Sequence, residues 1–227
     1  MPNVKNTMID ALLSMVAPHL CSGCGQIGSP FCDNCKYNIS EEPFSGCILC
    51  QKPHPFGVCD DHNSSYNQAF VVGERSGPLQ QLIGGYKFKN IKAASVALAD
   101  LLDRRLPPFP ADSVLVAIPT SPAHIRERGY DHMALIAKRL GALRKVTVSK
   151  VLVRDNTLTQ HHANRKDRIE QAKSAFRIAG PINADTTYII IDDVVTTGAT
   201  IEQAAKLLRA AGAVDIWVAA IARQPLD

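Results

Sequence analysis

The chain has 227 residues, of which 46% are hydrophobic and 20% charged, and its formal net charge is +4. This length is sufficient for one sizeable hydrophobic core and a smaller module. No apolar run reaches the roughly 18 residues that a membrane-spanning helix requires. We therefore expect a cytoplasmic protein without membrane insertion.

Positive charge is concentrated in the middle of the chain. Residues 120–177 contain thirteen Lys or Arg against five Asp or Glu, whereas residues 1–65 and 178–227 each carry three against six. Net charge alone does not indicate nucleic acid, because seven cysteine thiolates on two zinc ions would cancel most of it. The uneven distribution favours a polyanionic ligand, and a solvated basic helix face is the alternative.

The first predicted element is a short helix within residues 1–20. Residues 8–16 are amphipathic, contain Asp10 and are followed by Pro18 rather than by a small-residue cleavage site. This pattern favours a helix that packs on the rest of the protein over a signal peptide.

Residues 21–65 contain four pairs of potential metal ligands, each separated by two residues. These pairs are Cys21 with Cys24, Cys32 with Cys35, Cys47 with Cys50, and Cys59 with His62. A two-residue spacing lets both side chains of a tight turn point at one metal ion. Eight ligands complete two tetrahedral sites without an open position, so we predict a double zinc ribbon with two structural Zn²⁺ ions.

Two alternatives to this zinc module stay open. Disulfides need an oxidising compartment, for which the chain shows no secretory signal, and a redox dithiol needs only one cysteine pair. Sequential pairing of the four ligand pairs is favoured over an interleaved arrangement. His19 or His54 could replace His62, although neither has the same spacing.

Residues 66–227 show strands that alternate with helices, which indicates an α/β domain built on a parallel sheet with flanking helices. The expected strands are residues 66–74, 113–118, 146–154 (one strand or two), 188–191 and 215–222. The expected helices are residues 79–106, 130–143, 169–175 (weakly) and 201–211. Gly84 and Gly85 could bend the first helical stretch into two.

The most informative segment follows the apolar strand at residues 188–191. Asp192 and Asp193 come next, and carboxylates at the carboxyl end of a parallel strand can accept hydrogen bonds from vicinal sugar hydroxyls. A small-residue loop then leads into the helix at residues 201–211, whose first backbone N–H groups are suited to a phosphate. That loop consists of Thr196, Thr197, Gly198, Ala199 and Thr200.

Helix capping could account for one of these acids or threonines, but not for the whole ordered set. The segment resembles the 5-phosphoribosyl-1-pyrophosphate (PRPP) loop of type I phosphoribosyltransferases. This resemblance implies a fold of that type, with PRPP and Mg²⁺ as ligands and with Asp192 and Asp193 steadying the ribose.

A second loop follows the strand at residues 113–118 and contains Thr120, Ser121, Arg126 and Arg128. In type I phosphoribosyltransferases the loop at this position contacts pyrophosphate. By that resemblance, we expect the two arginines to donate bidentate hydrogen bonds to phosphate oxygens.

A polar stretch at residues 155–167 lies where that superfamily keeps its mobile lid. It contains Arg165, which we predict to bind the leaving pyrophosphate. His161 and His162 fit loop surface better than a general base or a metal site.

The combination of motifs resembles the ComF/GntX family over essentially the whole chain. The matching segments are the cysteine pairs, Tyr86-Lys87-Phe88-Lys89, Arg126 to Asp131, Arg154, Thr159-Gln160, Arg165, Phe176 and residues 190–200. The family joins a double zinc ribbon to a phosphoribosyltransferase-like domain, and its ComF members are associated with DNA uptake in natural transformation. Here Asp131 and His132 stand where the family more usually has Asn-Gln.

Two functions follow from this resemblance. The first is an enzyme that transfers phosphoribose from PRPP to an acceptor, with Lys87 among the residues that hold the leaving group. The second is a non-catalytic component of DNA handling that docks to competence proteins or single-stranded DNA through its zinc ribbons and its basic surface. Aromatic residues for stacking on bases are sparse, at 6% of the chain.

Overall fold

A computed structural model of the protein describes residues 18–154 and 176–226. The predicted packing helix at residues 8–16, the weak helix at 169–175, and Arg165 with the rest of the predicted lid lie outside the described residues. The proposed boundaries at residues 20 and 65 stay predictions. Within the described ranges, no helix is long and apolar enough to cross a membrane.

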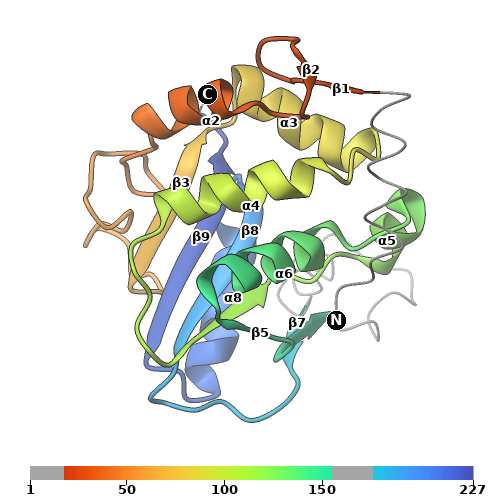
Figure 1. Ribbon diagram of the computed structural model, residues 1–227. Helices are drawn as coiled ribbons and strands as arrows, with labels where there is room; N and C mark the ends of the chain where they lie inside the picture. The colour runs from red at the N-terminus through yellow and green to blue at the C-terminus, as the bar shows by residue number, and fades with distance from the viewer. Residues whose placement is uncertain (1–17, 155–175, 227) are drawn as a thin grey trace, which may run out of the picture.

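A five-stranded sheet forms the centre of the molecule, and all four of its strand pairings are parallel (Figure 1). The strands, in spatial order, are β3 (Gln68–Glu74), β9 (Asp215–Arg223), β8 (Thr187–Val195), β4 (Ser113–Ala117) and β5 (Thr147–Ser149). The central strands β8 and β9 contain uninterrupted apolar runs at residues 188–191 and 216–222, as expected for strands that helices cover on both faces. The alternation of strands and helices expected from the sequence is confirmed.

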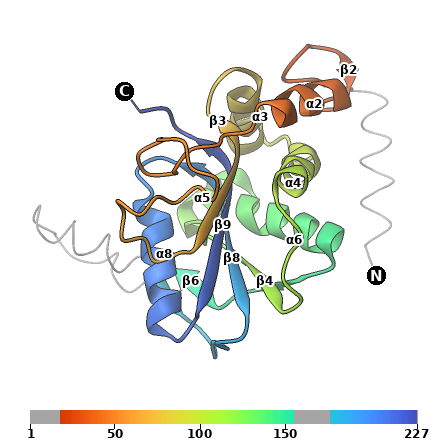
Figure 2. The same cartoon turned by 90° about the vertical axis from the view of Figure 1, so that its left-hand side faces the viewer.

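Helices form a layer on each face of this sheet (Figure 2). One layer contains α3 (Gly77–Phe88), α4 (Ala94–Arg105) and α6 (His132–Arg144), and the other contains α8 (Ala199–Ala210). Successive side chains of a strand point to opposite faces, so Ile189 and Ile191 of β8 pack towards the first layer and Ile190 packs towards the second.

The helical stretch expected at residues 79–106 is two helices, but the break is not at the predicted glycines. Gly84 and Gly85 lie inside α3, and the chain turns after Phe88, where Asn90 adopts a φ of 53°. Gly85 lies against Ile91, whose Cδ1 would be 3.1 Å from a Cβ at position 85. The absence of a side chain at Gly85 therefore lets the chain that follows α3 pack closely against this helix, and Gly85 does not bend the helix.

Smaller elements complete the structure. They are the antiparallel pair β1 (His19–Leu20) with β2 (Ile27–Gly28), helix α2 (Asp33–Glu41), helix α5 (Pro122–Arg128), and the antiparallel pair β6 (Leu152–Arg154) with β7 (Phe176–Ile178). The predicted strand at residues 146–154 is thus two strands in different sheets. Helix α5 was not predicted, and it carries Arg126 and Arg128, which the sequence placed in a loop.

Candidate functional site

The paired acids lie within β8, which is longer than the sequence suggested. β8 continues to Val195 because it pairs with β9 as far as Arg223, whereas its pairing with β4 ends at Ile191. From residue 192 onward, β8 therefore has a strand neighbour on one side only. Asp192 and Asp193 occur where the sheet opens, at the carboxyl edge where parallel sheets bind ligands.

Asp193 is 7% exposed and makes two charged or polar contacts. Its Oδ2 lies 2.7 Å from Nζ of Lys87, at the end of α3, and 2.7 Å from Nε2 of His132, at the start of α6. Two helices of the same layer thus converge on this carboxylate, while the Oδ1 of Asp192 accepts a hydrogen bond from the backbone N–H of Asp193. Lys87 was predicted for the site, and His132 was not.

Arg128 also contacts His132, since its Nη1 lies 3.0 Å from Nδ1 and 3.5 Å from Nε2 of the imidazole. An ionised carboxylate can only accept a hydrogen bond, so in the 2.7 Å contact with Asp193 it is Nε2 of His132 that donates. His132 is also held by its own carbonyl, which accepts a hydrogen bond from the hydroxyl of Tyr86. The only indication of His132 in the sequence is that Asp131-His132 stands where the family that the chain resembles more usually has Asn-Gln.

The two acids have opposite pKa shifts. Burial, together with the charge of Asp193, raises the pKa of Asp192 to about 8. Burial would also raise the pKa of Asp193, but the hydrogen bond from His132 and the charge of Lys87 outweigh it and lower that pKa to about 2. Near neutral pH, the site therefore holds one ionised carboxylate and one protonated carboxyl.

A pocket of about 240 Å³ lies beside the acids. Its lining includes seven of the predicted residues, which are Lys87, Thr120, Ser121, Arg128, Asp192, Asp193 and Thr200. The sequence did not assign three other polar lining residues to the site, namely His124, His132 and Arg154. Arg154 belongs to β6 and donates to the carbonyl of Pro119, so a strand outside the main sheet contributes to the pocket.

The other residues predicted to bind PRPP, among those that the structure describes, lie outside this lining. Arg126 is exposed on α5, and Thr196, Thr197 and Ala199 are exposed at the start of α8. Gly198 is the N-cap residue of α8, with a φ of 77°. The hydroxyl of Thr197 accepts a hydrogen bond from the N–H of Ala199 at 3.3 Å. This loop of residues 196–200, hereafter the phosphate loop, thus presents hydroxyls and helix N–H groups next to Thr200, which reaches the pocket.

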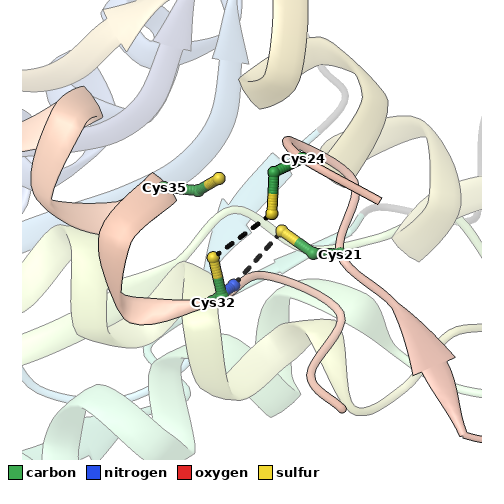
Figure 3. Close-up of side chains that lie close together, drawn as sticks. All are labelled: Cys21, Cys24, Cys32 and Cys35. Carbon is green, nitrogen blue, oxygen red and sulfur yellow. Dashed lines mark hydrogen bonds between the residues drawn. The ribbon is translucent and has the colours of Figure 1, made fainter. Parts of the chain in front are cut away.

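Four cysteines from the first part of the chain gather in one cluster (Figure 3). This first cluster consists of Cys21, Cys24, Cys32 and Cys35, whose sulfur atoms all lie within 4.8 Å of one another. Sγ of Cys24 is 3.7 Å from Sγ of Cys32, and the N–H of Cys32 donates to Sγ of Cys21. Burial raises the pKa of Cys21, but backbone hydrogen bonds outweigh it and lower this pKa to about 6.

The second cluster consists of Cys47, Cys50, Cys59 and His62, again within 4.8 Å of one another. Sγ of Cys50 and Sγ of Cys59 are 3.7 Å apart. Nε2 of His62 is buried without a hydrogen-bond partner among the described residues, which a metal ion would satisfy. Four thiolate or imidazole ligands at this spacing fit zinc, so both clusters could hold a structural metal ion. Each cluster combines two ligand pairs that follow each other in the sequence, as sequential pairing predicts.

Comparisons with known proteins agree with this architecture. The model of the phosphoribosyl transferase domain family matches residues 125–226. Competence protein F of Haemophilus influenzae is 30% identical over 219 residues, which cover 90% of each chain. DNA utilization protein YhgH of Salmonella typhi is 30% identical over 72% of this chain and 76% of its own length. Competence protein ComFC of Streptococcus pneumoniae is 27% identical over 90% of this chain and 87% of its own.

Fold and site together define a protein with a phosphoribosyltransferase-type domain and two N-terminal cysteine clusters that could each hold a metal ion. Competence protein F, at 30% identity over 90% of each chain, is similar enough to show the family. The chain belongs to the ComF/GntX family.

Proposed function

We propose that the protein binds PRPP together with Mg²⁺ in the pocket beside Asp192 and Asp193, and that it transfers phosphoribose to an acceptor. One observation carries this proposal: the pocket combines the paired acids of β8 with the cationic side chains of Lys87 and Arg128. A phosphorylated sugar needs both kinds of group, acceptors for its hydroxyls and donors for its phosphates.

The acids and the phosphate loop would hold the phosphoribosyl part. Asp192 and Asp193 accept hydrogen bonds from the ribose hydroxyls, and the ionised carboxylate of Asp193 stabilises the positive charge that develops at the anomeric carbon. The N–H groups of α8 bind the 5-phosphate, together with the side chains and backbone of the phosphate loop. This assignment covers Thr196, Thr197, Gly198, Ala199 and Thr200.

Cationic and hydroxyl groups of the pocket would hold the pyrophosphate. Lys87, Arg128, Thr120 and Ser121 line the pocket, and we assign further donors to Arg126 and Arg165. Mg²⁺ bound together with PRPP would supply positive charge that offsets the negative charge developing on the leaving pyrophosphate. The protein supplies no covalent nucleophile, so the rate would depend on positioning and on stabilisation of the separating charges.

Calorimetric titration with PRPP and Mg²⁺ tests this proposal. We expect saturable binding by the native protein and none by the Asp192→Ala/Asp193→Ala variant. The control is Glu41→Ala/Glu42→Ala, which removes an adjacent pair of exposed acids far along the chain from the pocket and should bind normally. Equal affinity of all three proteins would contradict the assignment.

A non-catalytic role in DNA handling is the second candidate. Two of the relatives described above are named competence proteins and a third a DNA utilization protein, and the basic residues of this chain concentrate in residues 120–177. The protein would then dock to competence proteins or to single-stranded DNA. Binding of an oligonucleotide with steep salt dependence, together with no binding of PRPP, would favour this role over the enzyme.

The two cysteine clusters would each hold one structural Zn²⁺. Purified protein should therefore contain close to two equivalents of zinc, measured by atomic emission. A reduced thiol set suits a reducing compartment, and we place the activity in the cytoplasm.

A further inference from the structure

The second cysteine cluster lies against the phosphate loop. Figure 2 shows the orange segment between α2 and β3, which supplies the second cluster, beside α8. The two residues between Cys47 and Cys50 are Ile48, which is fully buried, and Leu49, which is half-buried. Both make contacts that reach the loop or the strand that leads into it.

Arg223, at the end of β9, makes the first of these contacts. It is 1% exposed, and its guanidinium donates from Nε to the carbonyl of Ile48, from Nη2 to that of Leu49 and from Nη1 to that of Val195. Val195 is the last residue of β8 before the phosphate loop. One buried side chain thus fixes two carbonyls of the second cluster to the base of the loop.

Leu49 makes the second contact. A Cβ added to Gly198 would be 2.4 Å from Cδ2 of Leu49, so the leucine side chain packs directly on the glycine at the N-terminus of α8. A further link follows at Ser65, three residues after His62. Its N–H and hydroxyl both donate to the carboxylate of Glu202, in the first turn of α8.

The first cluster has different neighbours. Cys21 and Cys35 belong to the same hydrophobic core cluster as Leu79 of α3 and Leu98 of α4. Its helix α2 is joined to α4 by the ion pair between Lys36 and Asp100. These contacts lie on the helical layer and not at the phosphate loop.

We infer that Leu49 and Arg223 are positioning residues, through which the second cluster sets the position of the phosphate loop. Metal binding at Cys47, Cys50, Cys59 and His62 and phosphoribosyl binding at the loop then stabilise each other. This inference rests on the proposed function. Coupling between two sites is reciprocal, so it is measurable from either one.

The Leu49→Ala variant tests the coupling from the ligand side. It removes the contact with Gly198 and leaves every metal ligand in place. We expect unchanged zinc content and an affinity for PRPP with Mg²⁺ that is lower by about tenfold. Leu20→Ala is the matched control, because this leucine is adjacent to Cys21 but 63% exposed, and its affinity should equal that of the native protein.

Arg223→Lys tests the second link, because lysine keeps the charge but lacks the planar guanidinium that donates at once to the carbonyls of Ile48, Leu49 and Val195, besides that of the adjacent Gln224. We expect weaker PRPP binding and faster hydrogen exchange at both residues 47–50 and residues 196–200. If this variant does not fold, Leu49→Ala still decides the question.

The coupling is tested from the metal site by measuring the rate at which zinc is released to a chelating dye. In native protein, PRPP should slow the release of one of the two equivalents by about tenfold, and in Leu49→Ala it should slow neither. Native affinity in Leu49→Ala, or zinc release that saturating PRPP does not alter, overturns this inference alone. Absence of PRPP binding by the native protein overturns the proposed function, and this inference with it.

Discussion

The two cysteine clusters share one local motif but support different parts of the molecule. The first lies on the helical layer of α3 and α4, and the second lies on the phosphate loop at the carboxyl edge of the sheet. Metal coordination alone does not explain this difference, because ligand number and spacing are almost the same. The neighbours of the cysteines decide what each cluster stabilises.

The residues between paired cysteines already indicate this difference. Asp33 and Asn34, between Cys32 and Cys35, are exposed, whereas Ile48 and Leu49, between Cys47 and Cys50, are not. Polar residues at the tip of such a turn favour solvent, and apolar ones need a surface to pack against. A zinc ribbon with an apolar tip is therefore expected to dock on its neighbouring domain.

Removal of one ligand from each cluster should separate their roles most clearly. Cys47→Ser should lose one zinc equivalent, several kcal/mol of stability and PRPP binding, because the support of the phosphate loop is lost with the metal. Cys24→Ser should also lose one equivalent and several kcal/mol, but it should bind PRPP. Zinc content, urea unfolding and calorimetry measure the three quantities.

These two variants also show how the comparison could fail. Equal loss of PRPP binding in both would mean that each cluster stabilises the domain globally. Equal retention would mean that the phosphate loop keeps its position without the second metal site.

Two glycines allow a more local test, because Gly198 and Gly25 have nearly the same φ, 77° and 75°. Alanine at either position should cost about 1 kcal/mol for the left-handed backbone. Gly198→Ala should cost about 1 kcal/mol more, since it displaces the side chain of Leu49, whereas a Cβ at Gly25 meets no atom within 4 Å. Urea unfolding measures both.

A double-mutant cycle gives the control. Adding Leu49→Ala to Gly198→Ala should be less than additive, because the displaced side chain is already gone. Full additivity would show that the leucine does not press on the glycine.

Two acids, Asp192 in the ligand site and Asp33 beside the first cluster, should contribute differently to how stability depends on pH. The folded-state pKa of Asp192 is raised to about 8, so this group favours folding when protonated, and its contribution falls as pH rises from about 4 to about 8. Asp192→Asn should remove that decline, which urea unfolding between pH 5 and pH 8 measures. Beside the first cluster, a hydrogen bond from Lys36 lowers the pKa of Asp33, so Asp33→Asn should not change how the free energy of unfolding falls between pH 5 and pH 8. If Asp192→Asn showed the same fall as the native protein, Asp192 would not be the group with the raised pKa.

Much of the fold and part of the site could be predicted from the sequence, because both are encoded in short segments. Apolar runs gave the strands at residues 113–118, 188–191 and 215–222, and the acids and loop followed one of them directly. Ligand spacing indicated the two clusters. Helix α5 was missed because its seven residues contain Pro122 and show no apolar period.

The contacts that complete the site come from distant parts of the chain. His132 reaches Asp193 across 61 residues, and Arg223 reaches Ile48 across 175. No local pattern specifies such a pair, since it depends on how α6 packs on β8 and on how the second cluster docks. The order of the strands, with β9 between β3 and β8, has the same origin.

The smallest effect is expected at the ion pair that joins the first cluster to the helical layer. Nζ of Lys36 lies 2.8 Å from Oδ2 of Asp100 and 2.6 Å from Oδ1 of Asp33. Lys36→Met removes both ion pairs and keeps most of the aliphatic packing of the lysine side chain. The free energy of unfolding should fall by about 0.5–1 kcal/mol, because partly exposed pairs contribute little. PRPP affinity and zinc content should not change, as the helical layer holds this cluster apart from the phosphate loop. A measurable loss of PRPP affinity would mean that the first cluster also acts on the ligand site, and the contrast between the clusters would then be one of degree.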